Sequence, residues 1–183
     1  MLRSTHERST ILNAVRPSER PASTVRVEPL RHQDPAVAAQ IHAVLLPAYA
    51  QEGRLLGVQH FPPMQRTAAD IASGREFFLG AWSGRQLVGA LSIGADDEPD
   101  QICIQTLVVH PNHQRQGVAS ALMREVLSRA EGLVLAVATG AANAPALALY
   151  GSFGFSIYRH GVVGADDLAL VKLRRPASAR PIG

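Results

Sequence analysis

The feature that most constrains how this chain can fold lies between residues 102 and 130, where an apolar run passes through a short polar loop into an amphipathic segment. The apolar run predicts a strand over 102–109, and the spacing of apolar residues after Gly117 predicts a helix over 117–130. The first backbone N–H groups of a helix have no intrahelical partner, and the helix dipole is positive at that end. A strand, a loop and a helix in this order can therefore bind a diphosphate through the main chain alone.

Four residues of the loop and the first helical turn suit that role. Gly117 has no side chain to block the approach of phosphate to the main chain, and Ala119 and Ser120 are small enough not to obstruct the first turn. Arg115 can add charge-assisted hydrogen bonds. Two other nucleotide-binding loops are excluded, because the patterns G-x-x-x-x-G-K-[ST] and G-x-G-x-x-G do not occur in the sequence. The alternative is an ordinary strand-to-helix connection opened by a glycine.

A second segment, residues 143–155, predicts a short helix with an aromatic residue on its last turn. Asn143 can cap the helix, Pro145 suits its first turn, and Gly154 can end it. This places Tyr150 on the last turn. Taken in isolation, Tyr150 could equally be a half-buried aromatic anchor with its hydroxyl at the surface.

These two segments, in this order, resemble the signature motifs of the GNAT family of N-acetyltransferases. The first is Gln114-Arg-Gln-Gly117-Val-Ala119, entered through Val109-His-Pro111, and the second contains Asn143, Leu149-Tyr150 and Gly154-Phe155. The resemblance implies that the loop holds the pyrophosphate of acetyl-coenzyme A as a co-substrate. It also implies that Asn143 bonds the pantetheine arm or a nearby water, and that the Tyr150 hydroxyl lies near the sulfur of the coenzyme.

The resemblance therefore supplies a set of expected site residues. Tyr150 is the expected catalytic residue, and no metal is expected. The residues expected to bind the coenzyme are Leu107, Val108, Val109, Gln114, Arg115, Gln116, Gly117, Val118, Ala119, Ser120, Asn143, Ala146 and Tyr150.

The rest of the pattern resembles the GNAT fold over residues 24–174. We expect an α/β (α+β) domain with a mixed, mainly antiparallel sheet of six to seven strands and helices on both faces. A mobile segment 1–23 and a frayed tail 175–183 are expected to flank it, because both are polar and lack periodicity. Family architecture implies that strands 102–109 and 133–138 are parallel and splay apart, often beside a bulge, which frees main-chain groups of Leu107 and Val109 for pantetheine.

The remaining elements follow from hydrophobic periodicity and from turn residues. A first helix should begin at Asp34-Pro35 and end at Pro47, and residues 49–63 should form a loop on the acceptor side. A further helix is expected over 67–73. Further strands are expected over 24–28, 76–82, 86–93, 155–160 and 168–173.

Composition narrows the class of protein. The chain is 46% hydrophobic and 18% charged, and no apolar run approaches the roughly 18 residues that span a bilayer, so no membrane partner is expected. Cys103 is the only cysteine and the N-terminus lacks a secretory signal, which favours a cytoplasmic location. The net charge of +3 comes from arginines spread along the chain without an aromatic stacking motif, so nucleic acid is not an expected partner.

The implied reaction is direct attack by a neutral primary amine of a small molecule or peptide on acetyl-coenzyme A, with Tyr150 hydrogen-bonding or protonating the thiolate. A homodimer is compatible with the resemblance. The alternative function is a non-catalytic acyl-CoA-binding sensor or regulatory module. That alternative stays open because the strand that carries a Glu in many members of the family offers only Gln105 and Thr106 here.

Several residues could replace that missing base. Gln105 and Thr106 could hold a water that passes a proton to a carboxylate such as Glu98 or Asp100. Two histidines, His60 and His110, are further candidates because imidazole titrates near neutral pH. Cys103 is expected to be a small buried core residue rather than a nucleophile.

Overall fold

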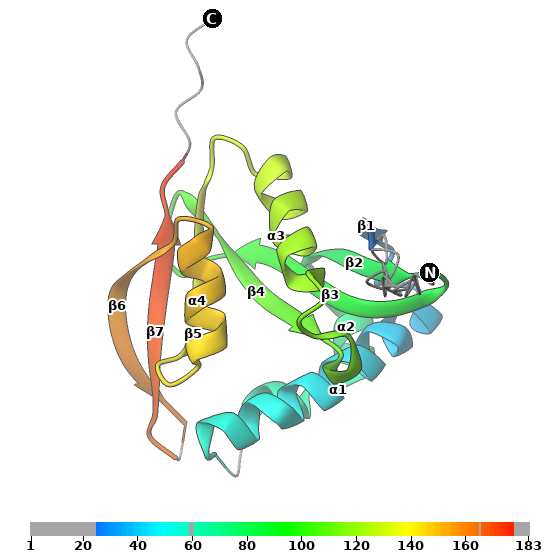
Figure 1. Cartoon of the computed structure of the whole chain (residues 1–183), viewed down its shortest axis with the longest axis horizontal. Coiled ribbons are helices and arrows are strands. Elements are labelled where there is room, and N and C mark those ends of the chain that lie inside the picture. The colour runs from blue at the N-terminus through cyan, green and yellow to red at the C-terminus, as the bar shows by residue number, and fades with distance from the viewer. Residues whose placement is uncertain (1–24, 59–60, 165, 178–183) are drawn as a thin grey trace, which may run out of the picture.

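The computed structural model describes residues 25–58, 61–164 and 166–177. The predicted terminal segment 1–23, residues 178–183 of the predicted tail and His60 lie outside the described residues. Figure 1 shows the elements in chain order. They are β1 (Arg26–Leu30), α1 (Pro35–Leu56), η1 (Pro62–Gln65), α2 (Ala68–Ser73), β2 (Phe77–Ser83), β3 (Gln86–Ala95), β4 (Gln101–Val109), η2 (Pro111–His113), α3 (Val118–Arg129), β5 (Val134–Gly140), α4 (Ala144–Ser152), β6 (Ser156–Val163) and β7 (Leu168–Arg175).

The described strands form one seven-stranded sheet in the order β1-β2-β3-β4-β5-β7-β6. Strands β4 and β5 are parallel, and the other neighbouring pairs are antiparallel. This confirms the predicted mixed, mainly antiparallel sheet. Within the described residues, no helix combines the length and the apolar character that crossing a bilayer requires.

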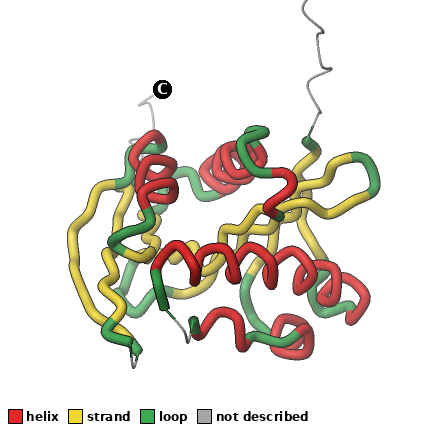
Figure 2. The backbone as a smooth tube through the Cα atoms, turned by 60° about the horizontal axis from the view of Figure 1, so that its bottom comes forward, coloured by secondary structure: helices red, strands yellow, loops and turns green. Residues whose placement is uncertain are grey.

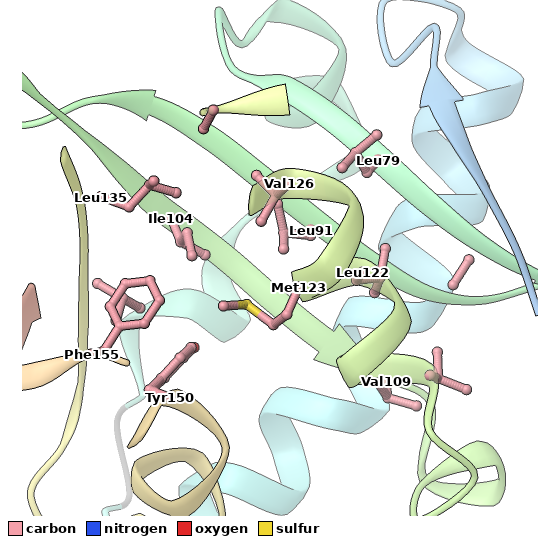
Figure 3. Packing of buried hydrophobic residues seen from close by; sticks show 14 of the residues in the cluster. Leu79, Leu91, Ile104, Val109, Leu122, Met123, Val126, Leu135, Tyr150 and Phe155 are labelled. Atoms are coloured by element: carbon pink, nitrogen blue, oxygen red, sulfur yellow. The ribbon is translucent and has the colours of Figure 1, made fainter. Parts of the chain in front are cut away.

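Helices cover both faces of the sheet, as predicted (Figure 2). On one face, α1 and α2 bury Ile41 and Ile71 in a cluster with Phe78 of β2. On the other face, Leu122 of α3 and Tyr150 of α4 belong to a second cluster, shown in Figure 3. The sheet therefore separates two hydrophobic cores.

The first helix is longer than the sequence predicted. Asp34 caps it as expected, with its carboxylate accepting a hydrogen bond from the Ala36 backbone N–H at 2.8 Å. The prediction that Pro47 ends the helix is wrong, because α1 continues to Leu56 and ends at Gly57, which adopts the left-handed conformation. A proline inside a helix costs about 3 kcal/mol. The helix continues because the same buried stripe runs on after the proline, through Ala48, Tyr49 and Gly53. Tyr49 is the one large side chain among these three, and burying a side chain of such size contributes about 1.5–3 kcal/mol, which is comparable to the cost of the proline.

The pairing of β4 and β5 stops halfway along the two strands. It covers residues 101–104 of β4 and 134–137 of β5, after which β5 pairs only with β7 among the described strands. The partner strand β3 aligns Ser92 with Thr106 but Ile93 with Ile104, so Gln105 is the extra residue of a bulge. The predicted splay beside a bulge is therefore confirmed, and residues 105–109 of β4 face an opening in the sheet.

Candidate active site

A cavity of about 950 Å³ lies where β4 and β5 separate. Its walls come from α1, β4, the loop after β4, the first turn of α3, and α4. Of the thirteen predicted site residues, twelve line it: Leu107, Val108, Val109, Gln114, Arg115, Gly117, Val118, Ala119, Ser120, Asn143, Ala146 and Tyr150. The exception is Gln116, whose side-chain amide instead donates to the Asn112 carbonyl at 3.2 Å within the loop.

The N-terminus of α3 opens directly into this cavity. Gly117 is the N-cap residue with φ +80°, and no side chain of the described part of the chain caps the helix there. A Cβ built at Gly117 would meet no atom within 4 Å, so the space beside it is open. Arg115, at φ +60°, is exposed at the same end of the cavity. Unpaired N–H groups and a positive helix dipole are the features that an anion site requires, and the loop sequence predicts such a site at this position.

One wall of the cavity was not predicted from the sequence. The second half of α1 lines it with Ala48, Gln51, Glu52, Arg54 and Leu55. These residues follow Pro47, in the region that was predicted to be a loop. Because the helix continues, the buried side of α1 extends along the edge of the cavity.

Gln51 ties α1 to the anion-binding loop. Its side-chain amide and that of Gln114 donate to each other, each at 3.1 Å. The Gln114 amide nitrogen also lies 3.3 Å from the Val109 carbonyl, to which it donates. The loop is therefore held against both α1 and the end of β4.

Glu52 ties α1 to the opposite helical layer. The Asn143 amide donates to the Glu52 carboxylate at 2.9 Å, while the Asn143 side-chain oxygen caps α4 by accepting from the Ala146 N–H at 3.2 Å. Since α1 and α4 cover opposite faces of the sheet, this contact passes through the opening between β4 and β5. Burial raises the pKa of Glu52 above its ordinary value, and the hydrogen bond from Asn143 offsets part of that rise.

Tyr150 lies on the last turn of α4, as predicted, and is only 6% exposed. Its ring packs beside that of Phe155, with centroids 5.8 Å apart (Figure 3). Burial is the main cause that raises the pKa of Tyr150, and the charges of Glu52 and Tyr49 raise it further. The phenol therefore stays protonated around neutral pH and can act as a hydrogen-bond donor to an atom in the cavity.

Comparison with known proteins identifies the family of this chain. The sequence profile described as the acetyltransferase (GNAT) family matches residues 45–155, which include the second half of α1, the loop, α3 and α4. The chain belongs to the GNAT family. That family consists of acyltransferase enzymes.

Two curated proteins are similar to parts of this chain. The chain is 34% identical to UPF0157 protein YqkA of Bacillus subtilis over 130 residues, which are 70% of this chain and 37% of YqkA. It is 36% identical to N-alpha-acetyltransferase RimI of Mycobacterium tuberculosis over 88 residues, 47% of this chain and 56% of RimI. The chain thus spans less than two thirds of the length of these curated relatives.

A solved structure shows the same fold. The yncA protein of Salmonella typhimurium, whose structure was determined with its cofactor acetyl-CoA, superposes with a TM-score of 0.64 at 18% identity. The match covers 88% of this chain and 98% of that protein. The GNAT fold predicted from the sequence is confirmed.

Of the proton acceptors considered from the sequence, those that lie within the described residues do not line the cavity. The Gln105 amide is exposed and donates to the Ala95 carbonyl at 3.2 Å. Glu98 accepts from the Tyr158 hydroxyl at 2.8 Å and pairs with Arg159 at 3.1 Å, beside β6. The ring of His110 caps η2 by accepting from a backbone N–H.

Three further candidates from the sequence can also be placed. Asp100 lies in the turn before β4 and is not among the lining residues. Thr106 is buried on the α1 side of β4, where a hydrogen bond from it lowers the pKa of Tyr49 against the larger effect of burial, which raises it. Cys103 is half-buried and lies outside both hydrophobic clusters, so the prediction of a buried core residue is wrong, while burial and the charge of Asp96 raise the pKa of its thiol to about 11.

Sequence reasoning missed Glu52, although a signal for it was present. Residues 41, 45, 48, 49 and 53 of α1 are buried at helical spacing, and Glu52 lies next to this stripe, three and four residues after Tyr49 and Ala48. A charged residue beside an apolar stripe indicates either a partner or a function. The signal was lost because the helix was expected to stop at Pro47.

Proposed function

We propose that this chain transfers the acetyl group of acetyl-coenzyme A to a primary amine of a small molecule or peptide. The observation that carries the proposal is one continuous cavity that joins the uncapped N-terminus of α3 to Tyr150 through the opening between β4 and β5. One end of this cavity suits a diphosphate. The other end offers a hydrogen-bond donor where a thioester would lie.

The lining fits an extended coenzyme. Main-chain N–H groups at the start of α3 can accept the diphosphate, with Arg115 as an added cation. Hydrogen bonds to charged groups contribute about 1.5–3 kcal/mol each. Leu107 and Val109 lie on a stretch of β4 that has no pairing with β5, so their main-chain groups, apart from the Val109 carbonyl that Gln114 already contacts, are available to the amides of a pantetheine arm.

The chemistry at the far end requires little of Tyr150 beyond a hydrogen bond. A thiol has an ordinary pKa of about 8.5, whereas a phenol has one of about 10. Because burial raises the pKa of Tyr150, full proton transfer from it to a departing thiolate is uphill. The phenol would therefore stabilise developing charge on sulfur as a donor, in the manner of other preorganised donors.

The amines tested as acetyl acceptors should include peptide α-amines. One relative carries the name N-alpha-acetyltransferase, which supports a peptide N-terminus as one acceptor class for this chain. Polyamines, amino acids and amine-bearing antibiotics represent the small-molecule class.

The test combines binding with turnover. Isothermal calorimetry with acetyl-CoA measures affinity, and 5,5′-dithiobis(nitrobenzoate) measures thiol release across the amine panel. The protein adds at most one thiol per chain to the background, because Cys103 is its only cysteine. Saturable binding with amine-dependent thiol release supports the proposal. Saturable binding without release from any amine supports the sensor function instead, and no heat of binding overturns both.

A further inference from the structure

We propose that Glu52 is the base that takes the proton from the attacking amine, and that Asn143 is the positioning residue that aims its carboxylate. The inference rests on the proposed transfer reaction and names a group that this reaction requires. It differs from the expectation drawn from the strand before the loop, because the carboxylate comes from helix α1.

The cavity lining itself singles out Glu52. Among the lining residues in the described part of the chain, it is the only one with a carboxylate. The other charged or titratable lining groups are Arg54, His113, Arg115 and Tyr150. Of these, His113 and Arg115 belong to the anion-binding loop, so they lie at the phosphate end.

Two contacts place Glu52 at the acyl end. Its carboxylate accepts from Asn143 at 2.9 Å, and Asn143 caps the helix that carries Tyr150. The charge of Glu52 also acts on the phenol of Tyr150 and on that of Tyr49, raising the pKa of both. A base and a hydrogen-bond donor to sulfur are thus brought to the same end of the cavity from opposite faces of the sheet.

The surroundings of Glu52 suit a base. From its own helix, Tyr49 is its titratable neighbour, while Arg54 lines the same cavity. From α4 it meets Tyr150 and the neutral Asn143, and β4 presents the uncharged Leu107 and Val108 to the same cavity. Burial raises the pKa of Glu52 toward the range in which a carboxylate accepts protons effectively.

The transfer needs no reagent beyond the amine and acetyl-CoA. The lone pair of a neutral amine forms the new C–N bond to the acetyl carbon, and the C–S bond breaks with its electron pair leaving on the coenzyme thiolate. The proton from the amine nitrogen moves to the Glu52 carboxylate and from there to solvent. The thiolate accepts a hydrogen bond from Tyr150. One amine and one acetyl-CoA yield one amide, one coenzyme A thiolate and one proton.

The first experiment compares Glu52→Gln with Glu131→Gln, a control at an exposed carboxylate in the turn between α3 and β5. Glutamine keeps the size of the side chain and an oxygen that accepts from Asn143. We expect kcat/KM for the best amine of the panel to fall by about 10²–10⁴-fold in Glu52→Gln, a typical loss for a general base. Its affinity for acetyl-CoA should stay within a few-fold of wild type, and the control should match wild type in both.

A pH profile separates a base from a merely structural carboxylate. Wild-type kcat/KM should rise with pH along an acid limb that belongs to Glu52, at lower pH than the limb from deprotonation of the amine itself. The amine limb should be common to all variants, whereas the Glu52 limb should be absent from Glu52→Gln. Asn143→Asp keeps an effective cap but places a second carboxylate against Glu52, so its limb should move to higher pH by about one unit or more. The limb should persist in His113→Gln, which removes the ionisable ring from the lining.

The outcomes distinguish this inference from the proposed function. A Glu52→Gln protein that keeps wild-type turnover and the acid limb overturns the role of Glu52 while leaving the transfer reaction in place. A limb that disappears in His113→Gln instead assigns the titration to the histidine and overturns the inference. Wild-type protein that does not bind acetyl-CoA removes the reaction itself, and the inference with it.

Discussion

Two glycines at opposite ends of α3 provide the sharpest test of the anion site. Gly117 precedes the helix and Gly132 follows it, and both have φ +80°. A Cβ at either position would meet no atom within 4 Å. The two glycines are therefore matched in φ and in local space. Of the two, Gly117 lines the cavity and Gly132 does not.

Replacing either glycine by alanine should destabilise the fold by the same amount. A side chain in the left-handed region costs about 1–2 kcal/mol. For a chain of this length, each kcal/mol lowers Tm by about 2–4 °C, so either variant should melt about 2–8 °C below wild type in the absence of ligand.

Only Gly117→Ala should weaken coenzyme binding. The added methyl group projects into the open space where a diphosphate would approach the main chain, and losing one charge-assisted hydrogen bond costs about 1.5–3 kcal/mol. This corresponds to about 10- to 150-fold weaker binding of acetyl-CoA. Calorimetry on both variants measures it. If the two variants bind acetyl-CoA equally well, the diphosphate does not bind at the N-terminus of α3.

Three further predictions follow from named contacts. Tyr150→Phe should lower kcat about 10- to 150-fold, the loss of one charge-assisted hydrogen bond, with little change in acetyl-CoA affinity; unchanged turnover would remove Tyr150 from the mechanism. Burial raises the pKa of Glu52 above 4.5, so the folded state binds this proton more tightly than the unfolded state and becomes less stable as pH rises above 4.5. Glu52→Gln should therefore have a higher Tm than wild type at pH 7 and the same Tm at pH 4. Thermal melts at both pH values measure this difference. Lys172→Met leaves the buried carboxylate of Asp96 without its cation and should lower the free energy of unfolding by about 3–5 kcal/mol in urea titrations, whereas a loss below 1 kcal/mol would show that the pair is dispensable.

The anion-binding half of the candidate site could be predicted from the sequence because local spacing determines it. A strand, a loop with Gly117 and a helix lie next to one another in the chain, so their arrangement depends on short-range geometry. The same holds for Asn143, whose capping role follows from its position before Pro145. These features give most of the cavity lining.

The other half depended on tertiary packing. Local propensity argued that Pro47 ends the first helix, but burial of Ala48, Tyr49 and Gly53 keeps α1 helical for two more turns. Glu52 is 91 positions from its partner Asn143, and the two meet only because β4 and β5 separate between their helices. No spacing rule connects residues that far apart.

The short paired stretch between β4 and β5 has a consequence for how the molecule responds to its ligand. Among the described residues, only the pairs from Gln101–Val134 to Ile104–Val137 join β4 to β5, and the main-chain groups beyond them on that side of β4 have no strand partner. A bound pantetheine arm would supply hydrogen-bond partners for these main-chain groups, so the ligand would complete the sheet as well as react within the cavity. Amide hydrogen exchange in residues 105–109 should therefore slow sharply when the coenzyme binds, reporting occupancy even when no acceptor is present.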